Sequence, residues 1–310
     1  MAVRVSIVIP AYNADRFLAD AIDSVRRQTF TEWELVVVDD GSLDSTTAVA
    51  EHYRATDSRV RTVRQENGGI AAARNRGADI SDPTSEYIAF LDADDIWEPD
   101  LLAKLVGVLE RSPQAVAAHG RLRRVGPDGQ VISLSGTSTW PNQRRALAGC
   151  RLRKLPTEAP TTFAALAYSN FIPISGMVLR RAAKEAAGPF DGRTDMTADW
   201  DMWLRLSRHG DIMFVNDIVV NYRHSGTNYS LNRTRMDEAI RYVRRKILSA
   251  TDLRPSERRI VRLGHRYFEL HRCLQMSRNA GVAFADRRLS RGMSHAQNGF
   301  RHLWNVLRGI

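Results

Sequence analysis

The 310-residue sequence contains only two cysteines, Cys150 and Cys273, and no long uninterrupted apolar run. The cysteines lie 123 residues apart, without the spacing of a metal site, so we expect a reducing cytosolic compartment. No window approaches the roughly eighteen apolar residues that a membrane-spanning helix needs. The N-terminal apolar run stops at Pro10, which is too early for a signal peptide. These absences argue against a disulfide-rich secreted protein and an integral membrane protein.

The positive charge is concentrated in the tail. The formal net charge is +10, but residues 235–310 hold 17 Lys and Arg against 6 Asp and Glu, which leaves 28 against 29 for residues 1–234. This asymmetry predicts a catalytic or binding domain at residues 1–226, followed by a basic helical region at residues 227–310. Basic helices with an apolar stripe can contact an anionic membrane, pack on the catalytic domain or join a second subunit. Peripheral contact with the inner face of the membrane is the preferred expectation among these.

The first 120 residues alternate strand-like and helix-like segments. Apolar runs predict strands in "VRVSIVI", "WELVVVDDGS" and "YIAFL", and an alternating pattern predicts a strand in "RVRTVRQ". Helical spacing of apolar residues predicts helices in "RFLADAIDSV", "DSTTAVAEHYRA" and "GIAAARNRGADI". This rhythm predicts an α/β fold with a doubly wound, mostly parallel sheet flanked by helices. In such sheets ligands bind beyond the carboxyl ends of the strands. Those ends are marked here by "PAYN", "DDGS", "NGG" and "DADD".

The later part of the chain is less regular. Residues 124–160 carry Gly, Pro and Ser without periodicity, and we expect a variable loop or lid there. The segment "DWDMWLRLSRH" is expected to be a helix, and "IMFVNDIVVNYR" a hairpin or strand pair. The tail from about residue 235 is expected to be helical. Residues 1–120 and residues 121–226 would then form two halves of the first domain.

Three carboxylates follow the fourth predicted strand, at Asp92, Asp94 and Asp95. Like charges about 4 Å apart repel by roughly 4 kcal/mol at an effective dielectric constant near 20, so such a cluster favours a bound cation. Carboxylate oxygens suit hard ions such as Mg²⁺ or Mn²⁺. The alternative is that Asp94 or Asp95 caps a helix beginning near Glu98.

The ordered motifs "VSIVIPAYN", "VVVDDGS", "NGGIAAARNRG", "YIAFLDADD" and "ADWDMWLRL" resemble those of glycosyltransferase family 2, which has the GT-A fold. The resemblance covers roughly residues 3–226, and it implies a nucleotide-binding half at about residues 1–120 and an acceptor half at about residues 121–226. It implies an inverting, metal-dependent transfer of a sugar from a nucleotide donor, with UDP the expected nucleotide. The acceptor would be a glycan, a lipid-linked molecule or another hydroxyl compound, as in cell-surface polysaccharide synthesis.

The resemblance also implies roles for individual residues. The base would lie against Pro10, Ala11, Tyr12 and Asn13, and Asp40, or its neighbour Asp39, would accept the uracil imide proton. Arg74 and Asn75 would contact the nucleotide and its diphosphate, and Asp92 and Ala93 would lie near the ribose. Asp94 would bind Mn²⁺ or Mg²⁺, and His224 would be a further metal or phosphate ligand.

Each of these residues has a simpler explanation. Tyr12 could be a buried residue at a strand end, and Asp40 could cap the following helix, although Ser42 already fits that task. Arg74 could be a solvated surface arginine. His224 could be structural or merely exposed.

The resemblance places the general base at Asp199, which would take the proton of the acceptor hydroxyl. Asp201 is two residues away, and positions two apart do not share a helix face, so at most one of the two enters the site. The family usually has Glu-Asp where this chain has Ala198-Asp199, which puts the contacts of the missing glutamate in doubt. Asp199 could also be an acid favoured by the helix dipole. Ser175 and Gly176 are candidates for the acceptor-side wall.

Other classes of protein are less compatible with these motifs. A dehydrogenase needs Gly-x-Gly-x-x-Gly after the first strand, which "IPAYNADRF" lacks. A metal-dependent phosphatase or nucleotidyltransferase could use the Asp cluster, but it has no use for "DDGS" or Asp199. A nucleic-acid binder could explain the net charge, yet that charge is remote from the marked strand ends, so no nucleic acid is expected. The Gln-x-x-Arg-Trp motif of processive synthases is absent, which predicts a single addition.

Overall fold

A computed structural model of the chain describes residues 3–133, 160–224 and 232–279. The chain divides into two compact units, Met1–Arg262 and Leu263–Ile310. The functional division near residue 226 stays a prediction. Most of the predicted loop or lid at residues 124–160, and the tail after residue 279, lie outside the described residues.

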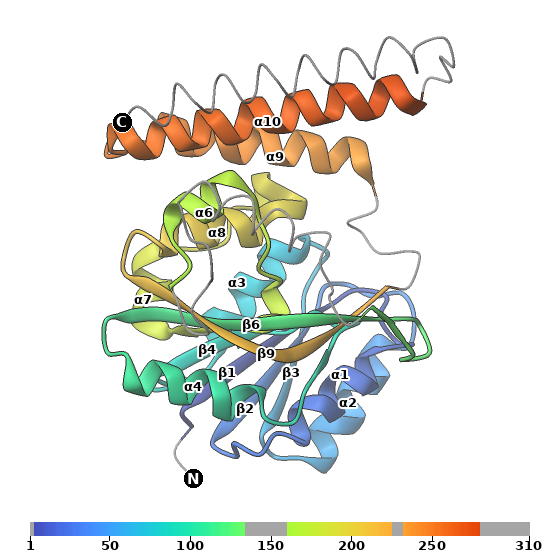
Figure 1. Ribbon diagram of the computed structural model, residues 1–310. Helices are drawn as coiled ribbons and strands as arrows, with labels where there is room; N and C mark the ends of the chain where they lie inside the picture. The colour runs from blue at the N-terminus through green and yellow to red at the C-terminus, as the bar shows by residue number, and fades with distance from the viewer. Residues whose placement is uncertain (1–2, 134–159, 225–231, 280–310) are drawn as a thin grey trace. The chain divides into compact units, whose positions relative to one another are not determined.

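The first unit is built around one sheet of nine described strands (Figure 1). Their order is β3-β2-β1-β4-β8-β6-β9-β5, with β7 beside β6. The strands are β1 (Val5–Ala11), β2 (Trp33–Asp39), β3 (Val60–Arg64), β4 (Tyr87–Phe90), β5 (Ile96–Trp97), β6 (Ala115–Val125), β7 (Val131–Ser133), β8 (Met177–Arg180) and β9 (Asp211–Arg223).

The half of the sheet formed by β3, β2, β1 and β4 is parallel, as the sequence predicts. Its crossovers are helices, and further helices follow in the second half of the unit. The α-helices of this unit before residue 225 are α1 (Leu18–Arg26), α2 (Thr46–Thr56), α3 (Ile70–Ile80), α4 (Leu101–Arg111), α6 (Phe163–Tyr168), α7 (Arg181–Ala187) and α8 (Ala198–Leu206), and the 3₁₀ helices are η1 (Ile174–Gly176) and η2 (Gly192–Thr197).

The two faces of the parallel half are covered by different helices. Because side chains alternate along a strand, Ile7 and Ile9 of β1 face α1 and α4, whereas Val8 packs in the apolar cluster of α3 and α8. Helix α3 approaches the sheet closely at Gly77, where an added Cβ would lie 2.3 Å from Val8 Cγ1. This contact sets the position of α3, whose first turn lies at the carboxyl ends of β1 and β2.

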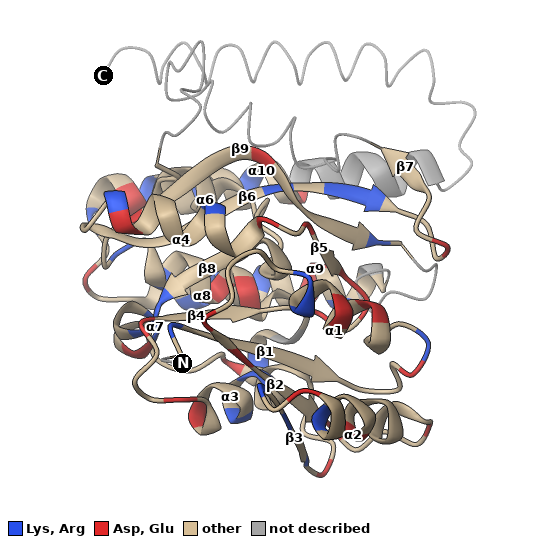
Figure 2. Ribbon diagram, turned by 90° about the horizontal axis from the view of Figure 1, so that it is seen from below, with Lys and Arg blue, Asp and Glu red and all other residues tan. Residues whose placement is uncertain are grey.

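The other half of the sheet is mixed. Strand β8 is antiparallel to both β4 and β6, while β9 is parallel to β6 and antiparallel to β5. The predicted hairpin in this region is wrong, because Asp211–Arg223 forms one continuous strand that shifts register against β6 around Arg121. Gly120 allows this irregular pairing, since a Cβ there would lie 2.5 Å from Val219. Three of the next residues of β6 are arginines, which colour that strand blue in Figure 2.

The predicted helical tail is present as α9 (Arg233–Ser249) and α10 (Pro255–Asn279). Helix α9 buries Ala239, Val243 and Ile247 and packs against η2 and α8. Part of the basic tail is therefore packed on earlier elements of the first unit. Within the described ranges, no helix has both the length and the apolar character that a membrane span requires.

Candidate active site

The three predicted carboxylates lie in a tight turn between β4 and β5. Asp95 is buried, and its carboxylate accepts hydrogen bonds from Ser175 Oγ at 2.5 Å and from the backbone N–H of Arg223 at 3.1 Å. Ser175 Oγ also accepts the backbone N–H of Asp92 at 3.1 Å. Helix α4 begins only at Leu101, after Asp100, so neither Asp94 nor Asp95 caps it. Asp95 and Ser175 instead fix the shape of this turn, which we call the acidic turn (residues 91–95).

Burial and mutual repulsion perturb these carboxyls. Burial and the charge of Asp92 raise the pKa of Asp94 to about 6. Burial and the charges of Asp94 and Asp92 raise the pKa of Asp95 well above its ordinary value. Ionisation of these carboxyls is therefore unfavourable, and a nearby cation would reduce its cost.

Arg223, at the end of β9, holds the acidic turn from the other side. Its Nε donates to the carbonyl of Asp94 at 3.0 Å, Nη1 to the carbonyl of Pro127 at 2.6 Å and Nη2 to the carboxylate of Asp20 at 2.6 Å. Its guanidinium also lies 4.7 Å from the ring centre of Phe17. This arginine ties β9, the acidic turn and α1 together, and its role was not recognised from the sequence.

The acidic turn fits a hard metal ion only with help from a ligand. Among the described residues, no group of three or more His, Cys, Asp or Glu side chains is arranged to hold a metal. Mg²⁺ and Mn²⁺ accept one or two carboxylates together with phosphate oxygens and waters, which suits Asp94. His224 follows Arg223 directly and has an exposed side chain, so it lies at the rim of this region.

Arg74 joins α3 to the acidic turn. Its Nη2 donates to Asp92 Oδ1 at 2.7 Å, and the residue is only 4% exposed, so it is not a solvated surface arginine. Its buried Nε has no hydrogen-bond partner among the described residues. A buried donor of this kind is costly unless it finds an acceptor, which favours an anionic ligand here. The neighbouring Asn75 is occupied elsewhere, because its amide makes two hydrogen bonds, of 2.8 and 2.9 Å, with the backbone of Phe190.

The ends of β1 and β2 form a second, well-ordered part of the site. Tyr12 is 50% exposed, so it is not a buried strand-end residue. Asn13 adopts the left-handed conformation (φ 48°), and its side chain accepts the N–H of Leu43 at 2.8 Å. Pro10 and Ala11 are buried in β1. Of these four residues, Tyr12 is therefore the one that presents an exposed aromatic ring beyond the strand end.

The two aspartates after β2 organise backbone. Asp39 accepts the N–H of Ser42 at 2.9 Å and the hydroxyl of Thr47, so it holds the turn into α2. Asp40 accepts the N–H groups of Gly68 and Gly69 at 2.9 and 2.8 Å, and the amide of Gln65 at 2.7 Å. Helix α2 begins at Thr46, and its first N–H is accepted by Asp44, so neither Asp40 nor Ser42 caps it. The contact of Asp40 with a base stays a prediction.

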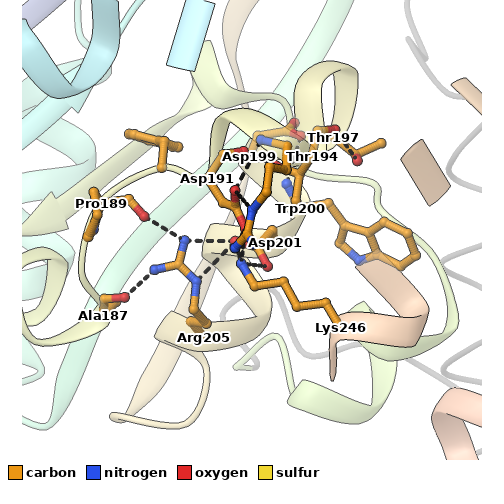
Figure 3. A network of polar contacts seen from close by, with 12 residues as sticks. Ala187, Pro189, Asp191, Thr194, Thr197, Asp199, Trp200, Asp201, Arg205 and Lys246 are labelled. Carbon is orange, nitrogen blue, oxygen red and sulfur yellow. Dashed lines mark hydrogen bonds and ion pairs between the residues drawn. The ribbon is translucent and has the colours of Figure 1, made fainter. Parts of the chain in front are cut away.

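Asp199 and Asp201 of α8 have different surroundings (Figure 3). Asp201 is buried and paired with Arg205 and with Lys246 of α9, so it belongs to an ion-pair network. Among the residues that the structure describes, no such cation is bonded to Asp199, which accepts its neighbour's N–H and the amide of Asn170. Burial raises the pKa of Asp199 to about 6, although the charge of Arg74 opposes the shift. Asp199 is therefore the member of the pair that is suited to proton transfer.

The surroundings of two residues depart from expectation. Ser175 and Gly176 do not form an acceptor wall, because both are buried and Ser175 holds the acidic turn. Ala198 is buried as well, at the position where the family usually has glutamate. The sequence alone does not identify Asn170, whose amide donates a hydrogen bond to Asp199. An isolated asparagine in "AYSNFIP" belongs to no recognisable motif.

Known proteins resemble the chain in sequence and in fold. Hyaluronan synthase of Pasteurella multocida is 31% identical over 229 residues, and chondroitin synthase of Escherichia coli is 29% identical over 229 residues; each match covers 74% of this chain. The chain spans only 21% and 30% of their lengths. Two solved structures share the fold at 19% identity: S. aureus TarS 1–349 with UDP-GlcNAc (TM-score 0.63, covering 83% of this chain and 70% of TarS) and the Pyrobaculum calidifontis mannosyltransferase PcManGT with GDP-Man and Mn²⁺ (TM-score 0.67, 98% and 84%).

The family model described as "Glycosyl transferase family 2" matches residues 6–181, which contain β1 except for its first residue, β2 to β8, the acidic turn and Arg74. The match confirms the predicted family, and the structural neighbours confirm the predicted GT-A fold. The chain belongs to glycosyl transferase family 2.

Proposed function

We propose that the chain is an inverting glycosyltransferase that moves a sugar from a nucleotide donor, preferably UDP-linked, to an acceptor hydroxyl. One observation carries the proposal. Arg74 contacts Asp92 directly, and the charges of both residues act on the pKa of Asp199. An anion-binding guanidinium, the acidic turn and a carboxyl suited to proton transfer are thus within electrostatic reach of one another.

In the proposed reaction, which is a single displacement, each residue has a separate role. The diphosphate lies against Arg74 and the first turn of α3, where backbone N–H groups and the helix dipole favour an anion. A divalent ion bound at Asp94 would neutralise the charge of the leaving diphosphate. Asp199, with a pKa of about 6, is mostly ionised at neutral pH and removes the proton of the attacking hydroxyl.

The base is proposed to stack on Tyr12, whose ring is exposed at the end of β1. Stacking of a base on an aromatic ring contributes about 1 to 3 kcal/mol in related systems. Among the structural neighbours, TarS was solved with UDP-GlcNAc and PcManGT with GDP-Man. We favour UDP because Asp40, whose backbone N–H donates to the carbonyl of Ala11 at the end of β1, is proposed to accept the imide proton of uracil.

The relatives named as hyaluronan and chondroitin synthases support a carbohydrate acceptor, and a lipid-linked acceptor stays a prediction. Single addition, a cytoplasmic location and contact of the basic tail with a membrane or a second subunit stay predictions. The rival phosphatase or nucleotidyltransferase has less support. It explains the acidic turn, but not the raised pKa of Asp199 or the electrostatic influence of Arg74 on it.

A thermal-shift screen tests the proposal. UDP, UDP-GlcNAc, UDP-glucose and GDP-mannose are added with and without Mn²⁺, because a ligand that binds the folded state raises the melting temperature according to its affinity. We expect a UDP compound to give the largest shift, and the shift to require the metal. Asp94→Asn should remove the metal-dependent part, whereas Asp79→Asn, an exposed aspartate of α3, should leave it unchanged. The proposal fails if no nucleotide shifts the melting temperature, or if Asp94→Asn behaves as the wild type does.

A further inference from the structure

Two tryptophans of α8 hold a neighbouring segment of backbone. Trp200 Nε1 donates to the carbonyl of Leu166 at 2.8 Å, and Trp203 Nε1 donates to the carbonyl of Ile172 at 3.2 Å. Both indoles are buried. Residues 166–172 are therefore fastened at both ends to the helix that carries Asp199.

Asn170 lies within this fastened segment. Its Nδ2 donates to Asp199 Oδ2 at 3.2 Å, and its Oδ1 accepts the backbone N–H of Ile172 at 3.3 Å. Because an N–H donates to Oδ1, the amide cannot turn over without losing that bond, so its NH₂ group must face Asp199. The other carboxylate oxygen of Asp199 accepts the N–H of Trp200 at 2.7 Å.

The segment is held from the C-terminal side as well. Arg244 of α9 donates to the carbonyl of Tyr168 at 3.0 Å, and its guanidinium lies 5.2 Å from the ring centre of Trp200. The same arginine therefore contacts the backbone two residues before Asn170 and the residue that follows Asp199.

The charged groups around Asp199 come from several elements. Arg74 of α3 favours the ionised carboxylate, and Asp92 of the acidic turn opposes it. Arg205 of α8 and Lys246 of α9 are paired with Asp201, and Lys246 also with Asp191. Asn170 is thus the one side chain that donates a hydrogen bond to Asp199 in the described part of the chain.

We propose that Asn170 is a positioning residue: it fixes the orientation of the Asp199 carboxylate, stabilises its ionised form and leaves one lone pair on each oxygen for the acceptor hydroxyl. The proposal rests on the proposed function, in which Asp199 is the general base. It adds a residue that lies outside the ordered motifs and depends on α9 for its support.

The decisive experiment follows the titration of Asp199 in the full chain, and it does not require activity. The protein is labelled with ¹³C at the aspartate carboxyls, and Asp199→Asn identifies the signal. The wild-type signal should titrate near pH 6. In Asn170→Ala the midpoint should rise by about one pH unit, because a hydrogen bond to the charged form is lost. Asn216→Ala, which changes an exposed asparagine remote from the site, should leave the midpoint unchanged.

A second variant keeps the proposal testable if Asn170→Ala does not fold. Asn170→Asp keeps the shape of the side chain but replaces the donor by an acceptor, so its midpoint should lie higher still. A midpoint within about 0.2 pH units of the wild type in both variants overturns the proposal. A lower melting temperature with an unmoved midpoint also overturns it, because the role would then be structural only.

Release of UDP from UDP-GlcNAc, with water in place of the acceptor, gives the kinetic readout. Asn170→Ala should lower kcat about ten-fold at pH 6.5, leave KM unchanged and move the acid limb of the pH profile upward. If the wild type turns over none of UDP-GlcNAc, UDP-glucose and GDP-mannose, the proposed function fails, and the carboxyl titration still decides whether Asn170 controls Asp199.

Discussion

The guanidinium of Arg74 and the carboxylate of Asp92 meet at 2.7 Å, and this pair connects helix α3 to the acidic turn. The pair leaves the buried Nε of Arg74 without a partner among the described residues. Arg74→Lys keeps the positive charge but removes the planar guanidinium, which can donate to Asp92 and to a diphosphate at the same time. We expect UDP affinity to fall about 10- to 100-fold, measured by isothermal titration calorimetry. Arg76→Lys, on an exposed position of the same helix, should bind UDP as the wild type does.

Neutralising Asp199 should stabilise the protein at alkaline pH. The folded-state pKa is about 6, above the value near 4 of an unfolded aspartate, so the folded state binds more protons between these values. Stability is therefore fully present below pH 4 and is lost as the pH rises through 6. Asp199→Asn removes this loss, and we expect a gain of about 1 to 3 kcal/mol in the free energy of unfolding at pH 8.

Urea unfolding at pH 8 and at pH 4 measures this effect. The gain should largely disappear at pH 4, where Asp199 is protonated in the folded state and about half protonated in the unfolded state. Asp201→Asn is the matched control, because that carboxylate is paired with Arg205 and Lys246, and its neutralisation should destabilise the protein at pH 8. Equal effects of Asp199→Asn at both pH values would contradict the prediction.

Lys246 connects α9 to α8, the helix that carries Asp199 and Asp201. Its Nζ lies 2.8 Å from both Asp191 and Asp201, and Asp201 is buried. Lys246→Met leaves these carboxylates without that cation, and we expect the free energy of unfolding to fall by about 1 to 3 kcal/mol. Arg245→Met, at the adjacent exposed position, should change it by less than about 0.5 kcal/mol. Denaturant unfolding distinguishes the two, and equal losses would show that α9 is not fastened through Lys246.

The close approach of α3 to the sheet predicts opposite effects at two helical glycines. Gly77→Ala places a Cβ 2.3 Å from Val8, so it should destabilise the protein by about 1 to 3 kcal/mol. At Gly107 in α4 the nearest atom is the flexible end of Arg111 at 3.4 Å, so Gly107→Ala should be stabilising by up to about 1 kcal/mol. Thermal unfolding of both variants gives the comparison, and a stable Gly77→Ala protein would contradict the packing of α3.

The parallel half of the fold could be predicted because three of its strands are short apolar runs, β3 alternates valine with polar residues, and helices separate the strands along the chain. Val36 to Val38 of β2, for example, are buried on both faces of the sheet. Strand β9 could not be predicted in the same way. Asn216 and Asp217 resemble a turn, and only pairing with β6, about a hundred residues earlier, makes the segment continuous.

The candidate active site likewise has a part that the sequence predicts and a part that it does not. The motifs at the strand ends predict which carboxylates and which arginine gather, because parallel strands bring their carboxyl ends to one edge. The residues that orient them are ordinary polar residues far away in the chain. Ser175 lies 80 residues from Asp95, and Arg223 lies 128 residues from it. The choice between Asp199 and Asp201 likewise depends on Lys246 of α9, which no local pattern connects to them.

The network around Lys246 also constrains how the family can diverge. Because one ammonium serves two carboxylates on separate elements, a relative that loses the cation should also have lost an acid at position 191 or 201. Positions 191, 201 and 246 should therefore covary. Helix α9 should be inherited together with α8 rather than exchanged between relatives as an independent module.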